Sequence, residues 1–225
     1  MLNTKLILIE GLPGAGKSTS TVHLGMVLQQ HDIACQCFQE EDDPHPISCL
    51  DLEIKELPEK MVPLWTNFVQ QSMREQIVTI IESRLWHNTA LFMYMSEVDV
   101  EDILKFHQQV WRVLTPLSPI LLYIDQDNTD MALHRMYATR GEKWMEDALK
   151  ETTPYKWFKS RGITNFSGWV QFFEEWHYVA ERLYNDWPYD KKKIMNPHEN
   201  WEKAYEQMCA FMQIDGSQLS TCSSF

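Results

Sequence analysis

The segment Gly11–Ser18 constrains this chain more than any other feature of its sequence. It reads Gly-Leu-Pro-Gly-Ala-Gly-Lys-Ser and fits the pattern G-x-x-x-x-G-K-[ST] at every fixed position. The apolar run Lys5–Glu10 before it is typical of a buried strand, and a helical pattern follows from Lys17 to about Gln30. A glycine-rich turn between a strand and a helix is the setting in which this motif forms a phosphate-binding loop.

The residue types of this loop suit a polyphosphate. Glycines let successive backbone N–H groups turn toward phosphate oxygens, and the free N–H groups of the following helix add to the same positive field. Lys17 is expected to act as a catalytic cation on the β- and γ-phosphates, and the Ser18 hydroxyl is expected to ligate Mg²⁺. The sequence therefore predicts ATP and Mg²⁺ as cofactors, with the choice between ATP and GTP left open. The residues expected to hold the nucleotide are Gly11, Leu12, Pro13, Gly14, Ala15, Gly16, Lys17, Ser18 and Thr19.

Short apolar runs alternate with amphipathic helical patterns along the chain. This alternation predicts an α/β fold of the P-loop NTPase type, with a doubly wound, five-stranded parallel sheet and helices on both faces. We expect one domain over residues 1–214, a lid-like segment at about 135–165 and a flexible tail at 215–225. The expected strands are Lys5–Glu10, Ile33–Gln39, Ile77–Glu82, Ile120–Asp125 and Lys192–Met195. The expected helices are Lys17–Gln30, Leu64–Gln76, Asp99–Leu114, Thr129–Thr139, Phe166–Trp187 and Glu199–Ile214.

Composition limits the partners. A net charge of −12 over 225 residues argues against a nucleic-acid backbone and favours a small ligand. The five cysteines are odd in number and irregular in spacing, and Cys35 and Cys37 are interpreted as small core residues of one strand. We interpret the cysteines as reduced thiols, and no apolar run is long enough to span a membrane. Glu10 interrupts the first apolar stretch well short of the length of a signal peptide. We therefore expect a cytoplasmic protein without membrane or nucleic-acid partners. The sequence leaves open whether the protein forms a homodimer.

Carboxylates at the ends of predicted strands are candidates for catalysis. A P-loop site needs a second carboxylate near the metal, and either Glu82 or Asp125 could provide it. A kinase also needs a base for the acceptor hydroxyl, and Glu40 or Glu41 could serve because both follow the second strand. The plainer interpretation is that Glu82 and Asp125 end their strands in solvent and that the acidic run is a solvated surface.

Positive charge gathers after the fourth strand. Arg135 and Arg140 stand before Gly141 in a segment with further lysines, which suits a lid that covers the nucleotide and neutralises charge on the transferred phosphoryl group. The plainer interpretation is that these cations balance nearby acids. Trp144 and Trp157 in the same segment are weaker candidates for stacking on a ring.

In this order of motifs the chain resembles the thymidylate kinase and deoxynucleoside kinase group of P-loop kinases, and most closely a bacterial thymidylate-kinase-like set. The likeness runs over nearly the whole chain, through IEGLPGAGKST, the acidic loop, Glu82 to Leu85, Arg135 with Arg140, and Pro154-Tyr155. It implies a five-stranded parallel sheet, ATP and Mg²⁺. The chain departs from the group in the order Glu82-Ser83-Arg84 and lacks its Arg-rich monophosphate pattern, so the resemblance does not name the acceptor.

These observations favour a kinase that moves the γ-phosphoryl group of Mg-ATP to a small acceptor. The acceptor could be a nucleoside, a nucleotide, or another hydroxylated molecule, including a cationic one such as an amino sugar. The alternative is a nucleotide-binding switch or regulator that hydrolyses ATP or GTP slowly and has no small-molecule acceptor. The sequence has no N-K-x-D motif for reading guanine, which weighs against the switch.

Overall fold

Five parallel strands form one sheet in the order β2-β3-β1-β4-β5. The structure, a computed structural model, describes residues 2–48 and 54–214, so the tail predicted at 215–225 lies outside the described residues. The five strands and their parallel pairing confirm the α/β class predicted from the sequence. The strands are β1 (Leu6–Gly11), β2 (Cys35–Phe38), β3 (Val78–Glu82), β4 (Ile120–Asp125) and β5 (Lys191–Met195).

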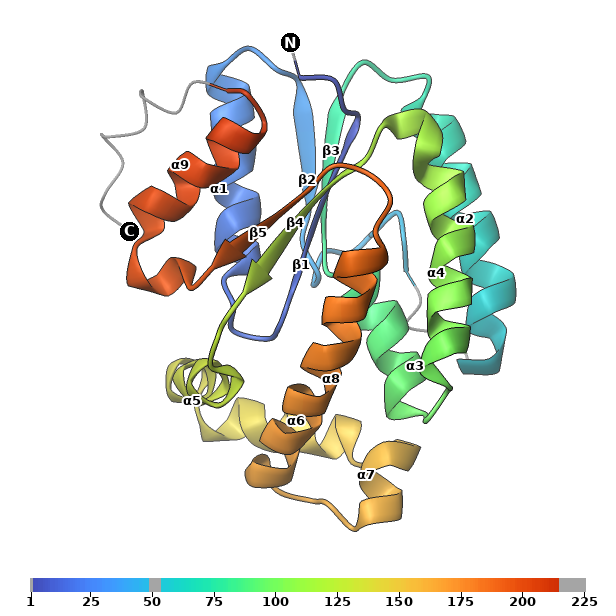
Figure 1. The fold of residues 1–225 in the computed structure, drawn as a ribbon, viewed down its shortest axis with the longest axis vertical. Helices are drawn as coiled ribbons and strands as arrows, with labels where there is room; N and C mark the ends of the chain where they lie inside the picture. The colour runs from blue at the N-terminus through green and yellow to red at the C-terminus, as the bar shows by residue number, and fades with distance from the viewer. Residues whose placement is uncertain (1, 49–53, 215–225) are drawn as a thin grey trace.

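Helices cover both faces of the sheet (Figure 1). Helices α1 and α9 lie on one face, and α2, α3, α4 and α8 lie on the other. Helices α5, α6 and α7 gather beyond the carboxyl ends of β4 and β5, where the P-loop also lies. The helices are α1 (Lys17–Gln30), α2 (Leu57–Ser72), α3 (Leu91–Met95), α4 (Val100–Leu114), α5 (Thr129–Arg140), α6 (Glu142–Thr152), α7 (Lys156–Arg161), α8 (Phe166–Asp186) and α9 (Trp201–Phe211), with short helical turns η1 (Ile54–Glu56), η2 (Trp86–Ala90), η3 (Thr115–Leu117) and η4 (Pro197–Glu199).

The three central strands form the middle of the core. Every residue of β1, β3 and β4 is buried, because helices cover both faces of the sheet there. This burial explains why these strands read as largely apolar runs. Each run also has a buried acidic residue at or next to its carboxyl end, namely Glu10, Glu82 and Asp125. Among the described helices, none has the length and apolar character needed to cross a lipid bilayer.

The structure differs from the expected elements at α2 and in the segment 141–164. Helix α2 begins at Leu57, whereas the prolines suggested a loop up to Pro63. Pro58 stands in the first turn, where the backbone N–H that proline lacks has no helical partner, and Pro63 is accommodated inside the helix. The segment 141–164, expected to be irregular, contains α6 and α7, so the lid-like region is largely helical.

Candidate functional site

The P-loop joins the central strand β1 to α1. Gly14 and Gly16 have φ angles of +72° and +105°, which residues with a Cβ atom rarely adopt. Helix α1 begins at Lys17 without a side-chain cap and without an acidic residue in its first turn. Its first N–H groups are therefore available to an anion.

The last part of the described chain supports this loop from outside. His198 Nε2 lies 2.9 Å from the Gly14 carbonyl oxygen. A Cβ atom on Gly16 would stand 2.5 Å from the ring of Trp201, so the loop and the start of α9 are in close contact. Tyr205 continues this contact by stacking on His23 of α1, with ring centres 3.5 Å apart.

Lys17 and Ser18 have the positions that the motif predicts. The Lys17 side chain is 6% exposed, and its ammonium group donates to the Leu12 carbonyl at 3.1 Å. Ser18 Oγ donates to Glu82 Oε1 at 2.7 Å, which places the loop hydroxyl beside the carboxylate that ends β3. The other oxygen, Glu82 Oε2, is buried without a hydrogen-bond partner among the described residues. Burial raises the pKa of Glu82, and Lys17 and Ser18 oppose that effect.

This pair of oxygens fits a magnesium ion. Hydroxyl and carboxylate oxygens are the hard ligands that Mg²⁺ accepts, and Mg²⁺ in nucleotide sites keeps several waters in addition. A metal ion would also give Glu82 Oε2 the partner that it lacks. Ser18 and Glu82 are therefore suited to hold Mg²⁺ directly or through water.

Asp125, the other metal candidate, lies at the end of β4 and is paired with basic side chains instead of the P-loop. Its carboxylate is 3.0 Å from His177 Nε2 and 3.2 Å from Lys193 Nζ, and it accepts the Gln126 N–H at 2.8 Å. Burial raises its pKa, but His177 and Lys193 more than offset this and hold it below its ordinary value. Asp125 does not line the cavity beside the P-loop. The structure thus brings Glu82, and not Asp125, to Ser18.

A cavity of about 700 Å³ opens beside the P-loop. This volume is in the range of small-molecule sites in proteins. The predicted catalytic residues Lys17, Glu40, Glu41, Glu82, Arg135 and Arg140 all line it. Its lining is polar near the P-loop and also includes aromatic and apolar side chains, namely Leu91, Phe92, Met95, Trp144, Trp169 and Phe173.

Glu40 stands among polar groups within this cavity. Its carboxylate is 3.8 Å from His87 Nε2, and Asn88, with its amide nitrogen toward Glu40, donates to it at 3.0 Å. Arg84 bonds both partners, since it donates to the Glu40 backbone carbonyl and to the Asn88 amide oxygen. Burial raises the pKa of Glu40, but His87, then Lys17, the Ser83 hydroxyl and Arg84 more than offset this, so the pKa lies below its ordinary value. Glu40 is therefore held as a carboxylate.

Glu41 and Arg140 meet at the edge of the same cavity. Arg140 Nη1 lies 3.7 Å from Glu41 Oε1, and both side chains are largely exposed. The Arg140 guanidinium group also lies over the ring of Trp144, 4.9 Å from its centre. Arg135 lies deeper, donates to Gln126 Oε1 at 2.9 Å and has a buried Nε atom without a described partner. Both arginines of the predicted lid thus reach the cavity.

Trp157 does not have the stacking position suggested by the sequence. It is 2% exposed and packs edge-on against Phe158 and Phe172, and its ring nitrogen donates to Glu175 Oε2 at 3.2 Å. The basic residues near it, Lys156 and Arg161, pair with Glu97 outside the cavity. In α7, Trp157 is therefore part of the core, and Lys156 and Arg161 lie on the surface. Within the lid-like segment, the described residues that line the cavity come from α5 and α6.

The wall opposite the P-loop was missed at the sequence level. It comes from η2 and α3, which contribute His87, Asn88, Leu91, Phe92 and Met95. Five residues of η2 form a π-helical turn, which has no simple sequence pattern. The one available signal was the position of Arg84, two residues after the end of a strand, at the carboxyl edge of the sheet.

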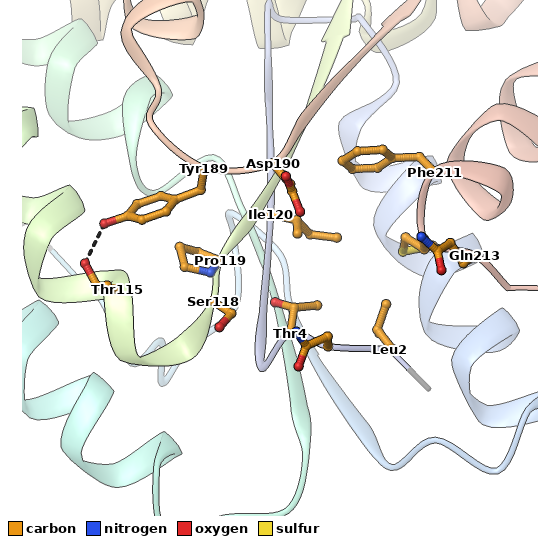
Figure 2. Close-up of a pocket in the computed structure, with 12 residues that line it drawn as sticks. Leu2, Thr4, Thr115, Ser118, Pro119, Ile120, Tyr189, Asp190, Phe211 and Gln213 are labelled. Atoms are coloured by element: carbon orange, nitrogen blue, oxygen red, sulfur yellow. Dashed lines mark hydrogen bonds between the residues drawn. The ribbon is translucent and has the colours of Figure 1, made fainter.

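A second hollow, of about 450 Å³, lies at the opposite edge of the sheet (Figure 2). Thr115 and Tyr189, which line it on one side, bond to each other at 2.6 Å, and Asp190 is the only carboxylate among its described lining residues. None of those lining residues is Lys, Arg or His, so this hollow offers no positively charged side chain to a phosphate group. The cavity beside the P-loop is the better candidate site.

The solved structures of similar backbone course include a deoxyadenosine kinase and a thymidylate kinase. The deoxyadenosine kinase from M.mycoides with bound dATP is 18% identical, with 96% of this chain and 100% of that chain covered and a TM-score of 0.49. The thymidylate kinase from Ehrlichia chaffeensis is 11% identical, with coverage of 93% and 98% and a TM-score of 0.48. No protein-family model and no curated protein matches the sequence. Both structures belong to the kinase group that the sequence motifs resemble, but at these values the likeness carries no conclusion about what this chain binds.

Proposed function

We propose that this chain is a kinase that transfers the γ-phosphoryl group of Mg-ATP to a hydroxyl group of a small, ring-bearing acceptor such as a nucleoside or nucleotide. The observation that carries the proposal is a single cavity lined both by the P-loop and by Glu40, whose lowered pKa keeps it ionised. A nucleotide switch needs the P-loop but not an apolar and aromatic wall beside a candidate base. That wall therefore favours the kinase over the switch.

In the proposed reaction the P-loop amides and Lys17 hold the β- and γ-phosphates. The acceptor hydroxyl oxygen bonds to the γ-phosphorus, the bond from that phosphorus to the β–γ bridging oxygen breaks, and ADP leaves. Glu40 accepts the proton of the hydroxyl group. Arg135 and Arg140 stabilise negative charge on the transferred group from the α5 side. Mg²⁺, held by Ser18 and Glu82, would neutralise charge on the phosphate oxygens when bound.

The acceptor wall suggests the type of acceptor. Phe92, Trp169 and Phe173 offer aromatic surface to a planar ring, and Arg84 and Asn88 offer polar groups next to Glu40. Arg84 Nε is buried without a described partner, so a polar group of the acceptor could bond there. A ring that carries a hydroxylated arm combines both properties.

A substrate panel tests this function directly. The protein is incubated with Mg-ATP and, separately, with nucleosides, nucleotides and amino sugars, and ADP release is followed. We expect at least one acceptor with a ring to raise ADP release well above the rate with ATP alone. Slow ADP release that no acceptor changes would contradict the kinase and favour the switch.

The metal assignment gives a matched pair of variants. Glu82→Gln should raise the Mg²⁺ concentration for half-maximal ADP release at least tenfold, because the carboxylate beside Ser18 loses its charge. Asp125→Asn should leave the Mg²⁺ dependence unchanged but lower the free energy of unfolding by roughly 3 kcal/mol, because it breaks a buried charge pair. Magnesium titrations and thermal unfolding distinguish the two. The opposite pattern would assign the metal to Asp125.

A further inference from the structure

A buried carboxylate immediately before the P-loop has no part in the proposed chemistry. Glu10 is the next-to-last residue of β1 and is fully buried. Its Oε1 accepts the N–H groups of Leu85 at 2.7 Å and Trp86 at 3.0 Å, and its Oε2 accepts the N–H group of His87 at 3.1 Å. Three consecutive backbone groups from the start of η2 thus bond one side chain of the central strand.

These three N–H groups stand where a helix has donors without helical partners. The first N–H groups of any helix need an outside acceptor, and a carboxylate suits the positive end of the helix. An acceptor is usually a nearby residue in the sequence, whereas Glu10 lies 75 residues before Leu85. The turn is therefore fixed to the strand that leads into the P-loop, and not only to itself.

A second buried side chain holds the same turn from the other side. His107 of α4 is fully buried, and its Nε2 lies 2.8 Å from the Leu85 carbonyl oxygen. Its Nδ1 lies 2.9 Å from the Ile103 carbonyl oxygen. Burial lowers the pKa of His107, so the neutral ring carries one N–H group and donates it to one of these two carbonyls. Leu85 consequently lies between two buried side chains, with Glu10 at its N–H group and the His107 ring at its carbonyl oxygen, and the Nε2–H tautomer of His107 donates to that carbonyl.

The turn held in this way carries the polar wall of the cavity. His87 and Asn88 belong to η2, Arg84 stands two residues before it, and all three surround Glu40. The Thr89 hydroxyl donates to the Arg84 carbonyl at 3.0 Å and closes the turn on itself. Any displacement of Leu85 would move these side chains relative to the P-loop.

We propose that Glu10 and His107 are positioning residues that keep the acceptor wall at a fixed distance from the phosphate cradle. The inference rests on the proposed function, because it assigns the 84–88 segment to acceptor binding. The burial of Glu10 is costly, since it raises the pKa of this carboxyl to about 7 despite three N–H donors. A chain that only needed to fill this space could do so with an apolar side chain at lower cost.

The test uses variants of nearly unchanged shape. Glu10→Gln removes the charge and turns an amide NH₂ group toward at least one of the three N–H donors. His107→Leu removes both ring contacts, and His107→Gln can restore a donor to the Leu85 carbonyl. Ile7→Val, in the same buried strand, is the control for a general loss of stability.

Three readouts are measured on each variant. Hydrogen exchange of residues 85–87 should accelerate at least tenfold in Glu10→Gln and His107→Leu, but not in Ile7→Val. Affinity for Mg-ATP should stay within threefold of wild type, and the KM for the best acceptor of the substrate panel should rise at least tenfold. His107→Gln should recover most of the acceptor KM.

The outcomes separate the two proposals. Unchanged exchange at residues 85–87, or an acceptor KM that stays at the wild-type value, would overturn the positioning role. An ATP affinity that falls as much as the acceptor affinity would do the same, because it would mark a general structural defect. If no acceptor stimulates the wild-type protein, the proposed kinase fails, and the exchange measurement still decides whether Glu10 and His107 hold the turn.

Discussion

A Lys17→Ala variant should lose acceptor-dependent ADP release by roughly 10³-fold. Lys17 is the cation within the P-loop, and its buried ammonium group lies 3.1 Å from the Leu12 carbonyl, inside the curve of the loop. Without the Lys17 ammonium group, the negative charge that develops on the β–γ bridging oxygen in the transition state is less well stabilised. Steady-state kinetics with the best acceptor measure the loss, and binding of a fluorescent ATP analogue measures how much arises from affinity.

Lys143→Ala provides the control for removal of one positive charge. Lys143 is an exposed residue of α6, pairs with Asp147 at 2.6 Å and does not line the cavity. This variant should keep ADP release within about twofold, because exposed pairs contribute little. Near-normal turnover in Lys17→Ala would refute the assignment of the phosphate site.

The second large effect is expected from Glu40→Gln. The variant should lower kcat by about 10²- to 10⁴-fold while the affinity for Mg-ATP stays within threefold, because a general base acts only on the acceptor. The pKa of Glu40 lies below its ordinary 4.5, so the wild-type carboxylate stays ionised across the neutral range and is lost only as the pH falls below that value. Single-turnover measurements at pH 7 isolate the chemical step.

Glu41→Gln distinguishes the two neighbouring acids. Glu41 is exposed and contacts Arg140 at the cavity edge, whereas Glu40 is surrounded by Arg84, His87 and Asn88. We therefore expect the smaller loss in Glu41→Gln. If this variant lost more kcat than Glu40→Gln, the base would be Glu41.

The parts of the molecule that the sequence predicted depend on local patterns. The strands β1, β3 and β4 are buried on both faces, so each is a short apolar run, and the P-loop follows from fixed residue types at fixed spacing. The rule that ligands lie beyond the carboxyl ends of parallel strands then selected Glu40, Glu82 and Asp125 as candidates. The same rule could not separate Glu82 from Asp125, because β3 and β4 both pair with β1. The contact with Ser18 depends on which of these two strands ends beside the start of α1.

The parts that were missed depend on contacts between distant residues. The turn η2 is stabilised by Glu10 and His107 from other elements, and no pattern within 86–90 indicates it. Pro58 and Pro63 suggested a loop because proline usually interrupts helices, yet the amphipathic face of α2 packs on the core and outweighs that preference. Trp157 was placed wrongly for a similar reason, since only the partners Phe158 and Phe172 show that it is buried.

The contacts of His198 and Trp201 with the P-loop have a consequence for how the site is made in the cell. Translation produces the glycine-rich turn before its outer support, which follows about 180 residues later in the chain. A nascent chain that has emerged only as far as α8 would possess the complete motif and lack the surface against which Gly14 and Gly16 rest. Competence to capture a triphosphate should therefore appear late on the ribosome, after η4 and α9 have left the exit tunnel.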